Sequence, residues 1–163
     1  PVLLGGLFKL TNNQAPMMRY AETPAKQKYE MLEFQRFIKA HAIPFKMNPR
    51  FPLNTLYVMR GAIAAQRLGC FAPYVDAVMT AMWHDGADMG DLDVVRDVLD
   101  KAGLDSDALL ALADNPEVKA ELISNTEAAA KRGAFGVPTF FVDEDMFWGK
   151  ERLGQVEAAL TKS

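Results

Sequence analysis

The segment that most constrains the fold is residues 136–143 (GVPTFFVD), near the end of the chain. Residues of high β-propensity follow a proline, which predicts a buried strand entered through Pro138. Proline has no N–H to donate to a sheet, and its peptide bond adopts the cis form at small cost. The chain can therefore turn sharply here and present the backbone of Val137 to a ligand. Because ordinary strand entries use the same residues, both a docking edge and a plain turn stay open.

Length and composition favour a single domain, or a small domain with an insertion. The chain has 163 residues, half of them apolar, and 18 basic against 21 acidic side chains give a net charge of -3. The basic residues are scattered singly, so no nucleic-acid partner is expected. No apolar run is long enough to span a bilayer, and the first residues lack the layout of a signal peptide. We therefore expect no membrane partner and a cytoplasmic protein.

The residues that most often carry metal or redox chemistry are few. Cys70 is the only cysteine, which excludes an internal disulfide or a Cys-x-x-Cys pair within this sequence and favours a small buried hydrophobe. His41 and His84 have no second ligand nearby, so no metal site is predicted. Trp83 and Trp148 are interpreted as core aromatic residues rather than as a stacking box for a ligand.

Periodicity divides the chain into strand, helices, hairpin and helix. Residues 2–5 are read as a strand and residues 9–14 as a polar loop. Helices are expected at 25–41, 54–68, 71–85, 91–102, 105–113 and 115–132, with Asn54 a candidate N-cap of the second and Asp91 or Asp88 of the fourth. Strands are then expected at 139–142 and 146–148, and a last amphipathic helix at 150–161.

A hairpin entered through proline and closed by a helix is the C-terminal half of a thioredoxin-like fold. In that fold the strand order is second, first, third, fourth. Only the second, third and fourth strands have candidates here, so the central strand is missing. Residues 2–5 and 139–142 should then lie about 9–10 Å apart, with the first strand supplied by a segment upstream of Pro1. The predicted division is a thioredoxin-like domain at 1–24 and 133–163, and an all-helical insertion at 25–132.

Four motifs in order resemble one known family over nearly the whole chain. They are PVLLGGLFK at 1–9, NPRFPLNT at 48–55, GAFGVPTF at 133–140 and FWGKERL at 147–153. The chain resembles the 2-hydroxychromene-2-carboxylate isomerases, with their relatives the kappa-class glutathione transferases and the DsbA-like oxidoreductases. The fold implied is α/β and thioredoxin-like with a large helical insertion. The resemblance also implies glutathione as cofactor and a homodimer.

The resemblance implies a set of glutathione contacts. The backbone of Val137, before a cis Pro138, would pair with the cysteinyl backbone of glutathione as an added strand. Lys26 matches a family lysine that contacts glutathione, and Asn13 a family asparagine beside the thiol. Their alternative interpretations are a surface lysine and a turn asparagine. Lys150 and Glu151 stand at the start of the last helix, where the γ-glutamyl group would bind, or where Glu151 is ordinary capping chemistry.

The second substrate is expected to be a small aromatic carboxylate. The resemblance suggests Lys9, Asn12, Asn13 and the loop at 48–54 for this role. Lys9 would offer a positive charge to the carboxylate, Asn54 an amide to an oxygen, and Arg50 a second cation. The family's catalytic serine follows the first strand and would lie before Pro1, so no catalytic residue is assigned within this sequence.

The activity implied is a glutathione-dependent cis-trans isomerisation that yields trans-o-hydroxybenzylidenepyruvate, a step of aromatic, naphthalene-type catabolism. Two alternatives use the same fold for other chemistry. They are a thiol-disulfide oxidoreductase of the DsbA type, which needs a Cys-x-x-Cys upstream, and a kappa-type glutathione transferase. A non-enzymatic ligand-binding or scaffold protein stays open as a third, since fold and cofactor site do not fix chemistry.

Overall fold

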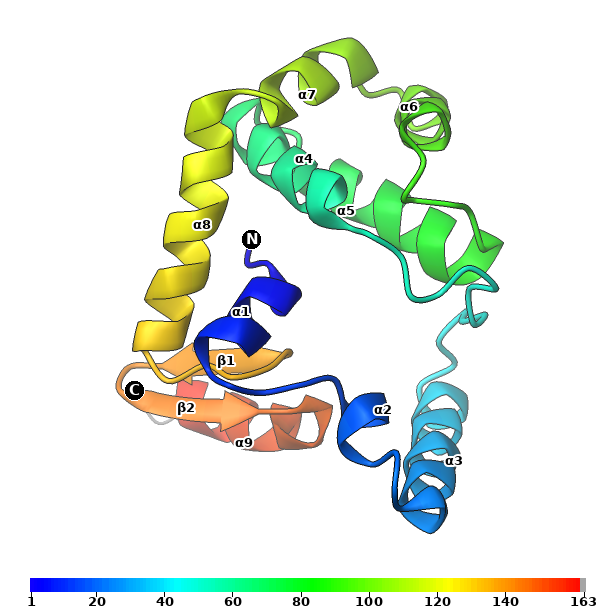
Figure 1. The fold of residues 1–163 in the computed structure, drawn as a ribbon, viewed down its shortest axis with the longest axis vertical. Helices are drawn as coiled ribbons and strands as arrows, with labels where there is room; N and C mark the ends of the chain where they lie inside the picture. The colour runs from blue at the N-terminus through cyan, green and yellow to red at the C-terminus, as the bar shows by residue number, and fades with distance from the viewer. Residues whose placement is uncertain (162–163) are drawn as a thin grey trace. The chain divides into compact units, whose positions relative to one another are not determined.

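The computed structural model describes residues 1–161, which form two compact units (Figure 1). One unit comprises Pro16–Leu122 together with Pro1, and the other comprises Val2–Ala15 and the chain from Ile123 onward. Helix α8 (Pro116–Lys131) runs through the border between them. Whether these units correspond to the two domains expected from the sequence stays a prediction.

The secondary structure of the first unit, over its described residues, consists of helices joined by loops. Its elements are α2 (Pro16–Arg19), α3 (Pro24–Ala40), α4 (Leu56–Arg67), α5 (Phe71–Thr80), a π-helical turn η1 (Ala81–Asp85), α6 (Leu92–Lys101), α7 (Ser106–Ala113) and the first part of α8. Each helix predicted between residues 25 and 132 is present, with ends shifted by no more than two residues, except that the one predicted at 71–85 finishes as the π-helical turn.

The core of this unit lies between α4, α5, α6 and α7. Small buried residues of α4 let its neighbours approach closely, and Tyr74, Val95 and Leu109 fill the space between the helices. Asp91, one of the two candidates for this cap, caps α6 by accepting from the N–H of Asp93. Cys70 is half-buried and packs against this core.

The expected N-cap of α4 is one residue off. Thr55 occupies the N-cap position, and its side chain makes no capping bond. Asn54 instead lies one residue earlier, where its Oδ1 accepts from the N–H of Leu56 at 3.1 Å. This is an Asx turn, in which a short polar side chain bonds the backbone two residues on, so the asparagine supports the helix entrance without being its cap.

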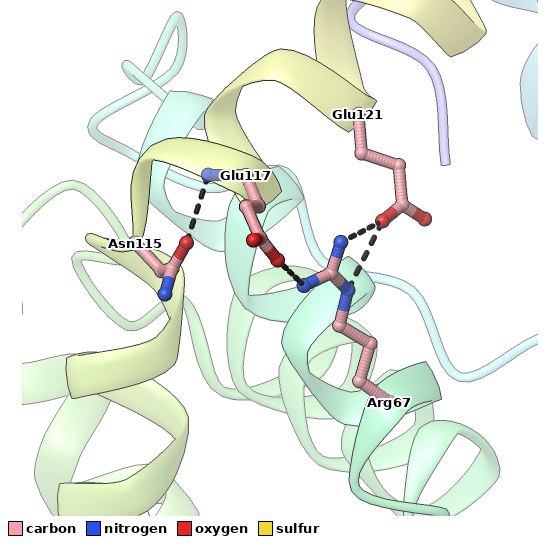
Figure 2. Close-up of polar contacts among 4 residues, drawn as sticks. All are labelled: Arg67, Asn115, Glu117 and Glu121. Carbon is pink, nitrogen blue, oxygen red and sulfur yellow. Dashed lines mark hydrogen bonds and ion pairs between the residues drawn. The ribbon is translucent and has the colours of Figure 1, made fainter.

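A charged cluster joins the end of α4 to the start of α8 (Figure 2). Arg67 donates from Nε and Nη2 to Glu121 Oε2 at 3.1 and 2.6 Å, and from Nη1 to Glu117 Oε2 at 3.2 Å. The Asn115 carboxamide accepts from the N–H of Glu117 at 2.8 Å, in the turn before α8. The two carboxylates raise the pKa of the Arg67 guanidinium above its ordinary value.

The second unit contains the β-structure. Helix α1 (Leu4–Leu10) precedes it, and the hairpin pairs β1 (Thr139–Val142) with antiparallel β2 (Asp145–Trp148) in the register Thr139 opposite Trp148. A 3-10 turn, η2 (Lys150–Arg152), leads into α9 (Leu153–Leu160), which packs against β1. Strands β1 and β2 and the closing helix confirm the C-terminal part of the sequence prediction.

The predicted strand at residues 2–5 is wrong. Residues 4–10 form α1, and its Leu7 is only 1% exposed. Short apolar runs do not distinguish a strand from a buried helix, and Leu4, Leu7 and Phe8 satisfy the helical period equally well. The N–H of Leu3 is held by the Thr126 hydroxyl at 3.1 Å rather than by a strand partner. The predicted parallel arrangement of residues 2–5 and 139–142 therefore does not occur.

The prediction that both tryptophans are core residues is confirmed for Trp83 only. Trp83 is half-buried against the helical core, whereas Trp148 is 48% exposed on β2, so the expectation that Trp148 is a core residue is wrong. The alternation of a two-stranded sheet turns this position outward. Among residues 1–161, no helix is both long and apolar enough to cross a membrane. The same residues hold no group of three or more potential metal ligands.

Candidate glutathione site

The loop between α8 and β1 presents one residue to solvent on a firmly held backbone. Beside it, the Gly136 carbonyl accepts from the Thr139 hydroxyl at 2.7 Å, and the Pro138 carbonyl accepts from the N–H of Gly149 at 3.0 Å. The Val137–Pro138 peptide bond is cis, as the resemblance implies. The loop is therefore fixed on both sides of Val137.

Val137 itself makes no such bonds. It is 53% exposed, and within residues 1–161 neither its N–H nor its carbonyl has a hydrogen-bond partner. Backbone groups left unpaired at the surface are available to an extended peptide, which would add to the loop as a short strand. The loop therefore offers an edge to which a peptide-like ligand can add.

Asn13 holds the same loop from the other side. Its Nδ2 donates to the Phe135 carbonyl at 2.8 Å, and its own N–H donates to the Phe8 carbonyl at 2.9 Å. The side chain therefore links the end of α1 to the segment before Val137. Asn12, next to it, has a φ of 51°, a left-handed conformation that asparagine tolerates better than most residues. Both asparagines thus lie in the turn after α1, and the role of Asn13 beside a thiol stays a prediction.

Trp148 covers the loop and explains why residue 136 is glycine. A Cβ on Gly136 would lie 2.8 Å from the indole Nε1. The rings of Trp148 and Phe135 are 5.0 Å apart at a 49° tilt, so the indole rests along the loop rather than inside the core. This role of Trp148 was not predicted from the sequence. The signal that would have indicated this role is a glycine in the loop that faces the end of β2.

The start of the last helix carries an ion pair. The Lys150 ammonium donates to Glu151 Oε1, and this hydrogen bond, with the charge behind it, lowers the pKa of the Glu151 carboxyl. Glu151 is therefore negative at neutral pH and suited to an ammonium group. Lys9, expected to serve the second substrate, is an exposed residue in the last turn of α1.

The remaining expected site residues belong to the helical unit. Lys26 is exposed in the first turn of α3, and its Nζ lies 3.9 Å from the centre of the Tyr20 ring, a cation-π contact. Arg50 and Asn54 lie on the loop between α3 and α4, and the Arg50 Nε is 3.2 Å from Asp88 Oδ2. The structure thus brings Asn13 to the loop that carries Val137 and Pro138, and it places Arg50 and Asn54 together on another loop.

A hairpin entered through a proline and closed by a helix, on a chain that also carries a helical insertion, defines a thioredoxin-fold protein of the inserted type. The chain belongs to the family of DsbA-like thioredoxin domains, whose family model matches residues 1–161. The expected fold class, thioredoxin-like with a large helical insertion, is thereby confirmed.

The names of individual relatives are more specific than the name of the family. The chain is 29% identical over 148 residues to a 2-hydroxychromene-2-carboxylate isomerase of Sphingobium xenophagum, covering 91% of this chain and 74% of that protein. It is 30% identical over 140 residues to the same-named enzyme of Pseudomonas sp. (strain C18), covering 83% and 63%. Glutathione S-transferase kappa 1 of Rattus norvegicus is 26% identical over 167 residues, covering 94% and 72%.

A solved structure agrees with these relatives. The chain matches a 2-hydroxychromene-2-carboxylate isomerase with a TM-score of 0.83 at 25% identity, covering 99% of this chain and 77% of the other. The resemblance to the isomerases and to the kappa-class transferases, first drawn from four motifs, is confirmed. The expected enzyme class, an isomerase, agrees with the names of these relatives. The chain spans between about two thirds and three quarters of the length of most of them.

Proposed function

We propose that this chain binds glutathione along Val137 and that the protein uses it to isomerise 2-hydroxychromene-2-carboxylate to trans-o-hydroxybenzylidenepyruvate in aromatic catabolism. The observation that supports it most is Val137, whose exposed and unpaired backbone sits in a loop held on both sides. The names of three relatives and one solved structure support the isomerase reaction. A cytoplasmic homodimer is part of the same proposal.

Several residues would hold glutathione. Val137 and Pro138 would receive its cysteinyl backbone, and Asn13, which already fixes this loop, would lie beside the thiol. Glu151, kept ionised by Lys150, would take the γ-glutamyl ammonium, while Lys150 and Lys26 offer positive charge to carboxylates. When bound, glutathione supplies a nucleophilic thiolate able to add to a conjugated carbon, which turns a double bond into a rotatable single bond.

The residues expected to meet the aromatic carboxylate act by charge and hydrogen bonding. Lys9 is exposed at the end of α1, with Asn12 and Asn13 in the turn that follows. Arg50 and Asn54 present a guanidinium and an amide on the other loop. In this role they orient the substrate and neutralise its carboxylate, leaving the bond rearrangement to the cofactor thiol.

A kappa-type glutathione transferase is the second candidate, and the rat relative is the observation that favours it. Both activities use the same cofactor loop. They differ in product, because a transferase leaves glutathione joined to its substrate whereas an isomerase releases it. Mass spectrometry of the product therefore separates the two.

The test uses the natural full-length protein with glutathione and 2-hydroxychromene-2-carboxylate. We expect glutathione-dependent formation of the trans isomer, and we expect added glutathione to protect the Val137 amide from hydrogen exchange. Val137→Pro, which removes the N–H donor, should weaken glutathione binding, whereas Val137→Ala, which keeps it, should not. Equal glutathione affinity in parent and Val137→Pro would contradict binding of glutathione along Val137. Failure of the protein to convert the substrate would contradict the isomerase activity.

A further inference from the structure

A single buried asparagine organises the loop that carries Arg50. Asn48 is 2% exposed, and its side chain uses three hydrogen bonds. Nδ2 donates to the carbonyls of Met82 and Ala87 at 3.0 and 2.8 Å, and Oδ1 accepts from the N–H of Arg50 at 3.0 Å. A carboxamide this deeply buried and this fully bonded does not meet a ligand, so its effect must pass through its neighbours.

The π-helical turn leaves the Met82 carbonyl available to the side chain of Asn48. At the end of η1 the N–H groups of Gly86 and Ala87 both donate to the Ala81 carbonyl. The Met82 carbonyl is thereby left outside the helical ladder and accepts from Asn48 instead. Gly86 closes the turn at a φ of 73°, and a Cβ there would lie 3.4 Å from Pro49 Cδ. The turn and the asparagine therefore fit each other.

Further contacts fasten the loop to the same turn. The N–H of Lys46 donates to the Trp83 carbonyl at 2.6 Å, and the rings of Phe45 and Phe51 lie 5.6 and 5.8 Å from the Trp83 ring. The aromatic contacts support the loop before and after Asn48. The loop is consequently a fixed platform rather than a loose connection between helices.

Arg50 is held at both ends. Asn48 holds its backbone N–H, and Asp88, just after the turn, lies 3.2 Å from its guanidinium Nε. Its side chain nevertheless remains 57% exposed. A guanidinium fixed through Nε keeps its two terminal nitrogens in the fork geometry that suits a carboxylate.

We propose that Asn48 is a positioning residue that fixes the direction in which Arg50 meets the carboxylate of an aromatic substrate. The inference rests on the proposed function, because it takes the substrate of the isomerase as the ligand of Arg50. It adds a residue that cannot itself touch the substrate and identifies the π-helical turn as its anchor. The buried carboxamide acts through the backbone of residue 50.

A double-mutant cycle tests this in the natural full-length protein. Asn48→Ala should lower kcat/KM for the chromene substrate by about tenfold, mainly through KM, while glutathione affinity is unchanged. In an Arg50→Met background the same change should cost less than about twofold, because the group that Asn48 positions is already gone. A loss of equal size in both backgrounds would show a merely structural role and overturn the proposal.

Two variants keep the test informative if Asn48→Ala folds poorly. Asn48→Asp retains the acceptor for the Arg50 N–H but loses both donors, and we expect a similar rise in KM and faster hydrogen exchange at the Arg50 amide. Tyr74→Phe is the matched control, since it removes a buried hydroxyl that donates to the Val58 carbonyl of α4 at 2.8 Å, a bond that does not involve the loop. It should lower stability and leave KM unchanged. A rise in KM with Tyr74→Phe would contradict a specific role for Asn48.

Assays of the parent protein distinguish a failure of this inference from a failure of the proposed function. If the parent does not isomerise the chromene, the proposed function fails, and the inference is then judged by calorimetric binding of trans-cinnamate, a conjugated aromatic carboxylate. Weaker cinnamate binding in Asn48→Ala that disappears in the Arg50→Met background would support the inference. The absence of cinnamate binding to the parent, or an effect of equal size in both backgrounds, would overturn it.

Discussion

The indole of Trp148 lies so close to Gly136 that a Cβ on residue 136 would come within 2.8 Å of its Nε1. The indole therefore covers the backbone just before Val137. Residue 136 is glycine because the ring leaves no room for a side chain there. The loop and the end of β2 therefore depend on each other, because a side chain at residue 136 would displace the ring that covers the loop.

Gly136→Ala should lower the melting temperature and weaken glutathione binding. The added methyl forces the indole or the loop to move, at a cost of about 1–3 kcal/mol for overpacking. Thermal unfolding and calorimetry measure the two effects. Gly154→Ala is the matched control, because a Cβ there meets nothing within 4 Å and alanine favours its helix, so stability should rise slightly. Trp148→Leu combined with Gly136→Ala should regain part of the lost stability, and the absence of any regain would contradict the crowding argument.

Lys9→Met should reduce kcat/KM for the chromene carboxylate by roughly tenfold or more, the scale of one lost charge-assisted hydrogen bond. Glutathione affinity should stay the same, because Lys9 is proposed to serve the second substrate. Lys39→Met is the control, since Lys39 is likewise an exposed lysine in the last turn of a helix. Unchanged kinetics together with weaker glutathione binding would reverse the assignment of Lys9.

Tyr57→Phe should change how stability depends on alkaline pH. Partial burial, followed by the 2.8 Å hydrogen bond to Asp114, raises the pKa of Tyr57 from about 10 to about 12. A raised folded-state pKa stabilises the fold below pH 10, and the contribution is lost as pH rises toward 12. The difference in melting temperature between parent and variant should therefore shrink over this range. Tyr29→Phe, at an exposed tyrosine, is the matched control for the loss of one phenolic hydroxyl.

The same hydroxyl also affects an acid. The hydrogen bond from Tyr57, followed by that from Lys119, lowers the pKa of Asp114. Its stabilising contribution is present above the ordinary carboxyl pKa and is lost as pH falls through the lowered value. In Tyr57→Phe the pKa of Asp114 should rise toward the ordinary range, as carbon-detected NMR titration can follow. An unchanged Asp114 titration would contradict the coupling.

Arg67→Met should lower the melting temperature by a few degrees, because it removes the cluster that joins α4 to α8. The difference from the parent should decrease as salt rises, since the contacts are partly exposed and screened. Arg19→Met, at an exposed arginine that ends α2, is the control for loss of one positive charge. A decrease that does not depend on salt would indicate lost packing of the arginine stem instead.

Much of the fold follows from local signals in the sequence. The helices between residues 25 and 132 were predictable because their apolar residues recur at helical spacing, and some of their starts are marked by a capping residue, such as Asp91 before α6. The hairpin followed from β-branched and aromatic residues after Pro138. The helix α1 was not predictable, because its apolar run is too short to show a period and its start depends on Thr126, more than a hundred residues away.

The candidate site was partly predictable in the same sense. The motif around Pro138 indicated Val137, and the resemblance supplied roles for Asn13, Arg50 and Lys150. Sequence could not show that Asn13 bonds the Phe135 carbonyl or that Asp88 holds Arg50, because these partners are distant in the chain. Nor could it show that Trp148 is exposed, since the side on which a strand residue lies depends on what packs against the sheet.

By itself the sequence determined which residue types stand at the turns and strand entries, and so it determined the family, since prolines, glycines and short polar residues restrict the backbone locally. Only the tertiary structure decided which of those residues are exposed and which are bonded to other residues of the chain. Asn48 is the clearest case, because its motif position is compatible with substrate contact, yet burial and three hydrogen bonds within the chain commit its carboxamide to the backbone. Burial and pairing are set by contacts between distant segments, which a local pattern does not contain.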